Sequence, residues 1–143
     1  MAAEDGWARI QAHLETYRRD PEQGHDWNPY GKPTTALLLT ARGRKTGKAR
    51  TLPLIYRKIG DAYVIVGSKG GSPDNPVWYK NLSAEPDCEI QVKHDVFRVT
   101  ARTAQGAERA ALWREMVEAL PQYEDYQALT DREIPVVVLE RRP

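Results

Sequence analysis

Apolar residues are spaced in two ways along this chain, at helical intervals near the start and in short continuous or alternating runs further on. Near the start, steps of three and four residues separate the large side chains Trp7, Ile10, Leu14 and Tyr17. That spacing predicts an amphipathic helix over residues 5–19, which Asp20-Pro21 ends. Such a helix packs on the domain, caps a ligand pocket or lies on a membrane surface. Its polar positions mix both charge signs, which weakens the membrane interpretation. The polar residues 22–32 predict a loop.

Shorter apolar runs follow, and most of them predict strands because turn residues bound each one. The expected strands cover residues 34–40, 50–56, 61–66, 87–93, 96–103 and 134–139. Residues 68–73 predict a flexible loop. Asn75 is the expected N-cap of a short helix that begins at Pro76 and stops before Glu85. Further helices are expected over residues 108–120 and 123–129.

This order of elements predicts one α+β domain. About six strands follow one another through short turns, which favours a mainly antiparallel sheet. A barrel with three or four helices packed outside it satisfies that pattern. We expect residues 1–143 to form a single domain, with residues 1–32 as a helical and loop extension at the N-terminus.

Composition narrows the chemistry. The 143 residues include 21 Lys+Arg and 20 Asp+Glu, so the net charge of +1 favours no class of partner. Cys88, the one cysteine, excludes an internal disulfide and is expected to be a buried apolar residue. The three histidines show no metal-ligand spacing, so no metal site is expected. No apolar run is long enough to span a membrane and no signal peptide is evident, so a cytoplasmic location is expected.

The positive charge is concentrated in one segment, residues 42–50, which we call the basic turn. It holds five cations in nine residues and two glycines, Gly43 and Gly47. Glycine lets a backbone bend around a ligand, while Arg and Lys bind phosphate or carboxylate. The spacing of the glycines and Ala49 exclude a Walker A loop. A solvated turn, an anion site and a nucleic-acid contact all remain open, although no basic stripe extends the patch.

Two further segments suggest a ligand site. Ser68-Lys69-Gly70-Gly71 follows a predicted strand and precedes Trp78, which offers a flat apolar face. Tyr123 and Tyr126 lie three residues apart, so they share a helix face and can donate hydrogen bonds to a planar substrate. The sequence shows no nucleophile paired with a base. An enzyme built this way therefore needs a cofactor for its chemistry.

Three segments in this order resemble a known family. They are Thr40-Ala41-Arg42-Gly43-Arg44-Lys45-Thr46-Gly47; Ser68-Lys69-Gly70-Gly71 with Asn75-Pro76-Val77-Trp78-Tyr79 and Asn81-Leu82; and Pro121-Gln122-Tyr123-Glu124-Asp125-Tyr126-Gln127 with Thr130-Asp131-Arg132-Glu133-Ile134-Pro135-Val136. Together they resemble the actinobacterial deazaflavin (coenzyme F420)-dependent nitroreductase and quinone reductase family of split β-barrel oxidoreductases. The resemblance covers about residues 33–140 and implies an α+β split barrel.

The resemblance also implies a cofactor and its contacts. Coenzyme F420 is a deazaflavin with a phosphate and a polyglutamate tail, and its reduced form would donate hydride to a quinone-like or nitroaromatic acceptor. The implied cofactor-binding residues are Arg44, Lys45, Thr46, Arg50, Thr51, Leu52, Pro53, Leu54, Ile55, Val66, Gly67, Ser68, Lys69, Val77, Trp78, Tyr79, Lys80, Asn81 and Tyr123. Lys45 and Arg50 are the implied phosphate grip.

Ser68 and Tyr126 are the implied catalytic residues, which would stabilise the developing oxyanion of the acceptor. Tyr123, Tyr126 and Leu120 are the implied substrate contacts. Leu120 and Ile55 occupy positions where relatives that reduce nitroimidazoles can carry tyrosine. This departure weakens the expectation of nitroaromatic reduction more than that of cofactor binding.

Other functions stay open at this point. A flavin mononucleotide oxidoreductase on the same barrel would need fewer cations than the basic turn supplies. A non-catalytic carrier of cofactor or lipid would not need the tyrosine pair. We expect no nucleic-acid partner, a monomer or homodimer, and a peripheral membrane contact only if the N-terminal helix does not cap the pocket.

Overall fold

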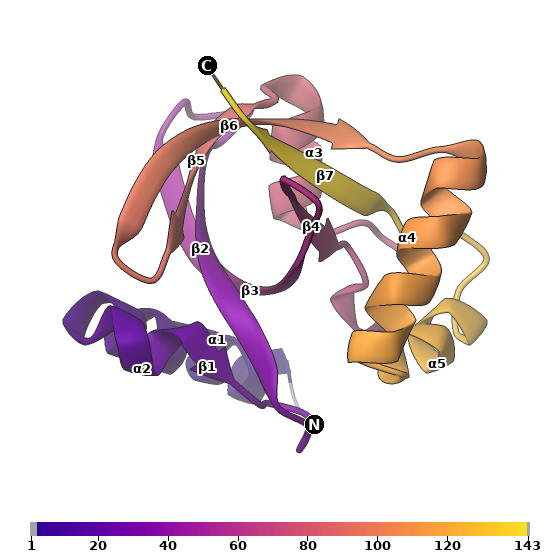
Figure 1. The fold of residues 1–143 in the computed structure, drawn as a ribbon, viewed down its shortest axis with the longest axis horizontal. Helices are drawn as coiled ribbons and strands as arrows, with labels where there is room; N and C mark the ends of the chain where they lie inside the picture. The colour runs from indigo at the N-terminus through magenta and orange to yellow at the C-terminus, as the bar shows by residue number, and fades with distance from the viewer. Residues whose placement is uncertain (1–2, 143) are drawn as a thin grey trace.

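The computed structural model describes residues 3–142, which form a closed antiparallel barrel with helices outside it (Figure 1). Its six strands are β2 (Thr34–Arg42), β3 (Ala49–Ile59), β4 (Ala62–Val66), β5 (Asp87–Val92), β6 (Asp95–Thr103) and β7 (Val136–Arg141). They run in the order β2-β3-β4-β7-β6-β5, and β2 pairs with β5 to close the barrel. A short seventh strand, β1 (Asp26–Trp27), pairs antiparallel with the start of β2. The predicted α+β split barrel is confirmed.

The wholly apolar runs of β2 and β7 are explained by burial on both faces. Leu37 and Leu39 point into the barrel core, while Ala36 and Leu38 pack under α1 (Ala3–Arg19). Strand β7 repeats this arrangement, with alternate valines facing the barrel core and the helices α4 (Gly106–Ala119) and α5 (Gln122–Ala128). Strands that are covered on both sides lose the alternation of apolar and polar residues.

Five α-helices lie in the described part of the chain, one more than the sequence predicted at most. In addition to α1 they are α2 (Pro21–His25), α3 (Val77–Ala84), α4 (Gly106–Ala119) and α5 (Gln122–Ala128), and a 3₁₀ turn spans η1 (Lys69–Gly71). Figure 1 shows α1 and α2 at the lower left and α4 with α5 at the right. None of the helices within residues 3–142 has the length and apolar character to cross a bilayer.

The predicted loop over residues 22–32 is wrong in its first part. Asp20 caps α2 by accepting a hydrogen bond from the Gln23 N–H (3.2 Å), and Pro21 is its first residue. Gly24 packs directly on Tyr17, where a Cβ atom would lie 2.4 Å from the Tyr17 Cα. The short helix therefore depends on a tertiary contact that a local pattern does not contain.

The predicted cap of α3 is also wrong. The helix begins at Val77 with Pro76 as its N-cap, and no side chain caps it. The Asn75 Oδ1 instead accepts a hydrogen bond from Arg132 Nη1 (2.9 Å). A guanidinium that is distant in sequence has taken the acceptor that the helix start would have used.

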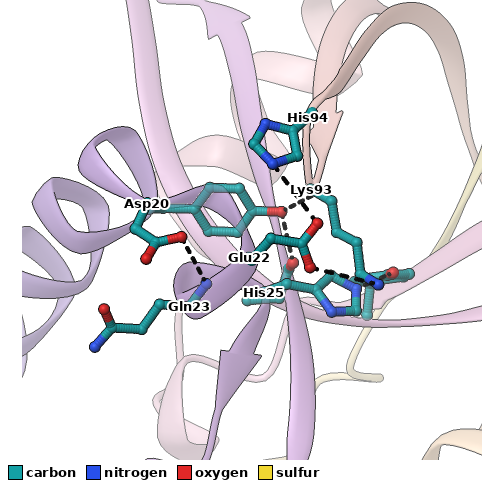
Figure 2. A network of polar contacts seen from close by, with 9 residues as sticks. Asp20, Glu22, Gln23, His25, Lys93 and His94 are labelled. Atoms are coloured by element: carbon teal, nitrogen blue, oxygen red, sulfur yellow. Dashed lines mark hydrogen bonds and ion pairs between the residues drawn. The ribbon is translucent and has the colours of Figure 1, made fainter.

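The end of α1 is fastened to the β5–β6 turn. The Tyr17 hydroxyl is buried and accepts a hydrogen bond from the Lys93 N–H (2.9 Å), with the Ala36 carbonyl 3.0 Å away as its acceptor. Figure 2 shows the Glu22 carboxylate beside Lys93 and His94, at 3.9 and 3.6 Å. These contacts hold α1 and α2 against the barrel.

Candidate functional site

A cleft of about 1020 Å³ lies between α1, β3, the basic turn, η1 and α3. Its volume suits a cofactor together with a small substrate. Most of the sequence-predicted cofactor residues line it: Arg44, Lys45, Thr46, Arg50, Thr51, Leu52, Pro53, Leu54, Ile55, Val66, Ser68, Lys69, Val77, Trp78, Asn81 and Tyr123. The fold thus brings residues from four separate segments to one cavity.

Three predicted cofactor residues do not line the cleft. Gly67 donates its N–H to the Pro135 carbonyl (2.9 Å) behind the cleft wall. The Tyr79 hydroxyl pairs with Thr103 Oγ1 (2.8 Å), in a smaller pocket beside β6. Lys80 is half-buried on α3, outside the lining residues. Their predicted contacts with the cofactor stay predictions.

The predicted substrate residues are divided by the structure. Tyr123 lines the cleft, whereas Leu120 is buried in the core beneath α4 and α5. Tyr126 is half-buried outside the lining, and its ring centroid lies 6.2 Å from that of Tyr30, which does line the cleft. Tyr126 therefore lies next to Tyr30, a residue of the cleft wall, but is not itself part of that wall.

The basic turn forms one end of the cleft with its charge unneutralised. Arg44 is held in place because its backbone N–H and Nη1 both donate to the buried Asn81 Oδ1, at 3.0 and 3.3 Å. Gly47 has a φ of 73°, which the tight turn requires. Across the described residues, no carboxylate forms an ion pair with any of the five cations. An anionic ligand would supply the missing counter-charge.

Residues 67–72, which we call the glycine loop, contribute Ser68, Lys69 and Gly70 to another part of the cleft wall. Ser68 is in the αR region, whereas Lys69, Gly70 and Gly71 have φ values of 45°, 63° and 80°. A lysine at positive φ costs free energy, and such strain is frequent at ligand sites. Gly71 has no alternative, since a Cβ atom there would lie 2.7 Å from the Tyr126 carbonyl oxygen.

A sequence model of F420H(2)-dependent quinone reductases matches residues 7–141. The chain belongs to this family. It is 49% identical over 110 residues to an F420H(2)-dependent quinone reductase of Mycobacterium tuberculosis. The aligned region covers 75% of this chain and 74% of that protein. The resemblance predicted from the three sequence segments is confirmed.

Solved structures agree with this family membership. An F420H2-dependent reductase, FDR-A, shares 42% identity and a TM-score of 0.68, over 73% of this chain and 93% of that one. A structure described as a domain-swapped dimer shares 35% identity and a TM-score of 0.71, over 96% and 100% of the two chains.

Burial keeps the two tyrosines of this family member protonated. Burial raises the pKa of Tyr123 well above its usual value, and the nearby tyrosine hydroxyls raise it further. Burial likewise raises the pKa of Tyr126, and Tyr30 adds to the effect. Both side chains are therefore hydrogen-bond donors over the physiological range. Burial also raises the pKa of the Cys88 thiol to about 11, which fits its predicted apolar role.

Sequence reasoning left one group of site residues undecided and missed another. The first is the wall opposite β3, made by α1 and the segment after it: Trp7, Arg9, Ile10, Gln11, Leu14, Arg18, Trp27, Pro29 and Tyr30. The periodic spacing of Ile10 and Leu14 was the available signal. The second is Arg132, whose guanidinium binds the glycine loop and had no signal beyond its place in a family segment.

Proposed function

We propose that the cleft under α1 binds F420 and is the place where this family member reduces a quinone. Family membership makes the chain an oxidoreductase that uses F420H2. The observation that supports the location is the cleft itself, because it joins an unneutralised cationic end to apolar walls. A cofactor with a flat ring and an anionic tail has the same two parts.

The residues present fit such a cofactor. Lys45 and Arg50 would bind its phosphate, with Arg44 and Thr46 beside them. The β3 segment from Thr51 to Ile55, together with Trp78, would enclose its ring and exclude water. When bound, reduced F420 supplies a hydride.

The chain's own task is then to orient the acceptor and stabilise its negative charge. We assign Ser68, which lines the cleft, as a hydrogen-bond donor to the acceptor oxygen that gains charge. We assign Tyr126, which lies beside the cleft-lining Tyr30, as a second donor. Donors that are held in place before reaction need no reorganisation when charge develops.

The apolar side of α1 supports a quinone as the acceptor. Ile10 and Leu14 line the cleft, so we assign α1 to capping the pocket. We expect weaker reduction of nitroaromatic compounds, since Ile55 supplies no hydroxyl to the cleft.

A turnover assay tests this function. The purified protein is mixed with reduced F420 and menadione, and F420 oxidation is followed by its absorbance. We expect oxidation that depends on both the protein and menadione. Binding of F420 without oxidation would favour a carrier, and binding of flavin mononucleotide alone would favour the flavin enzyme. Either result contradicts the proposal.

A further inference from the structure

Arg132 is the most highly connected side chain beside the cleft. Its Nε donates to the Ser72 carbonyl (2.8 Å) and its Nη2 to the Ser68 carbonyl (2.7 Å). Its Nη1 donates to the Gly67 carbonyl (3.1 Å) and to Asn75 Oδ1 (2.9 Å). One rigid guanidinium therefore holds both ends of the glycine loop, which a lysine could not do with the same geometry.

The segment that carries Arg132 is itself fixed. The Gln127 Nε2 donates to the Arg132 carbonyl (2.7 Å), and the Gln127 Oε1 accepts from the Ile134 N–H (2.9 Å). The Arg109 Nη2 donates to the Ile134 carbonyl (2.6 Å). The guanidinium thus extends from an anchored turn rather than from a free surface segment.

These bonds dictate which way two peptide groups face. In a trans peptide the C=O and the N–H point in opposite directions, and the described residues contain no cis peptide. The Gly67 and Ser68 carbonyls face Arg132, so the N–H groups of Ser68 and Lys69 face the other side of the loop. Ser68 and Lys69 line the cleft, and Arg132 does not. Neither N–H has a protein acceptor among residues 3–142.

The charge of Arg132 adds to this orientation. Within the described chain no carboxylate pairs with Arg132, so carbonyl oxygens are its main partners. A cation on the carbonyl side of a peptide polarises it and strengthens its N–H as a donor. Two adjacent N–H groups in an αR-αL pair form a concave site for an anionic or carbonyl oxygen.

We propose that Arg132 is a positioning residue that turns the Ser68 and Lys69 N–H groups into the cleft, where they bind a carbonyl or anionic oxygen of the ligand. This inference rests on the proposed function for the identity of the ligand, F420 with its acceptor. The orientation of the loop is a property of the protein alone, so it can be measured without either compound.

The matched variants are Arg132→Gln and Arg57→Gln. Both remove a guanidinium that donates to a backbone carbonyl, but Arg57 donates to Glu115 (2.8 Å), whereas Arg132 binds the glycine loop. Hydrogen exchange of the cofactor-free protein is read at the Gly71 and Ser72 amides, which bond to the Ser68 and Lys69 carbonyls at 2.9 and 3.1 Å. The Kd of oxidised F420 is measured by fluorescence on the same proteins.

In Arg132→Gln we expect the exchange rate at both amides and the F420 Kd to rise at least about tenfold. In Arg57→Gln we expect neither change. Unchanged exchange, or faster exchange with unchanged Kd, overturns the inference. If Arg132→Gln does not fold, Arg132→Lys is measured instead, with a smaller rise expected in both and the same overturning results. Wild-type protein that does not bind F420 would contradict the proposed function, while the exchange result still decides whether Arg132 orders the loop.

Discussion

Single residues at the cleft carry the sharpest expectations, beginning with the cationic end. Replacing Lys45 and Arg50 by Ala should raise the F420 Kd at least about tenfold, because each charge-assisted contact is worth about 1.5–3 kcal/mol before screening by solvent. The measurement is fluorescence titration with oxidised F420. Lys48→Ala is the control, since Lys48 belongs to the same turn but does not line the cleft. Equal affinity in the double variant and the control would contradict the phosphate grip.

Tyr126 tests the acceptor side. Tyr126→Phe keeps the ring beside Tyr30 and removes only the hydroxyl, so kcat should fall roughly tenfold or more while the F420 Kd stays nearly constant. Steady-state kinetics with menadione and an F420 titration measure the two quantities. Tyr63→Phe is the control, because Tyr63 lies on β4 and does not line the cleft. A loss of F420 affinity in Tyr126→Phe would place this residue on the cofactor side.

At the scale of elements, the strands were predictable because their pattern is local. The run Ala36–Leu39 is apolar throughout, and it lies under α1 on one face and in the barrel on the other. By contrast, α2 depends on Gly24 packing against Tyr17, and the Asn75 amide is taken by Arg132. Contacts between distant segments decide such cases, so the sequence pattern does not reveal them.

The candidate site, like the fold, was only partly predictable from the sequence. The basic turn and the glycine loop were recognisable as family segments in a set order. The wall that α1 contributes was only a periodic helix in the sequence, with three possible roles. Its role became visible when Ile10 and Leu14 were seen to line the cleft. A residue's partner across a cavity is set by the fold and leaves no local trace.

The docking of α1 and α2 should weaken in acid. Burial lowers the pKa of His13, which bonds to the Gly24 carbonyl (2.7 Å), and of His25, which bonds to the Tyr56 hydroxyl (2.8 Å). A histidine pKa below the unfolded value favours the neutral folded form. This stability is present above about pH 6.5 and is lost as the pH falls through the lowered folded pKa values. The exposed contact between His94 and Glu22 contributes little to stability.

Urea unfolding at about pH 7.5 and about pH 5.5 measures this loss. We expect a lower free energy of unfolding at the acidic pH. The double variant His13→Gln with His25→Gln should show a smaller difference between the two pH values. The same pH dependence in the variant and the wild type would mean that other groups cause the acid sensitivity.

For the whole molecule, stability depends on closing the barrel between β2 and β5. The pairs Leu38–Gln91, Leu39–Ile90 and Thr40–Glu89 form this seam, and the Leu39 and Ile90 side chains are fully buried. Leu39→Ala should lower the free energy of unfolding by about 2–5 kcal/mol, as measured in urea. Leu129→Ala, with 71% of Leu129 exposed, should change it by less than about 0.5 kcal/mol. A comparable loss in both would contradict the importance of the seam.

Strand β7 joins β4 to β6, and it is synthesised after both of them. While the chain emerges from the ribosome, β4 and β6 each present an unpaired edge, and such edges are templates for aggregation. Arg132 emerges just before β7, so the glycine loop also lacks its anchor until this late stage. The barrel and its cleft are therefore completed together. A nascent chain that stalls before β7 would be prone to aggregation, and its glycine loop would not be ordered.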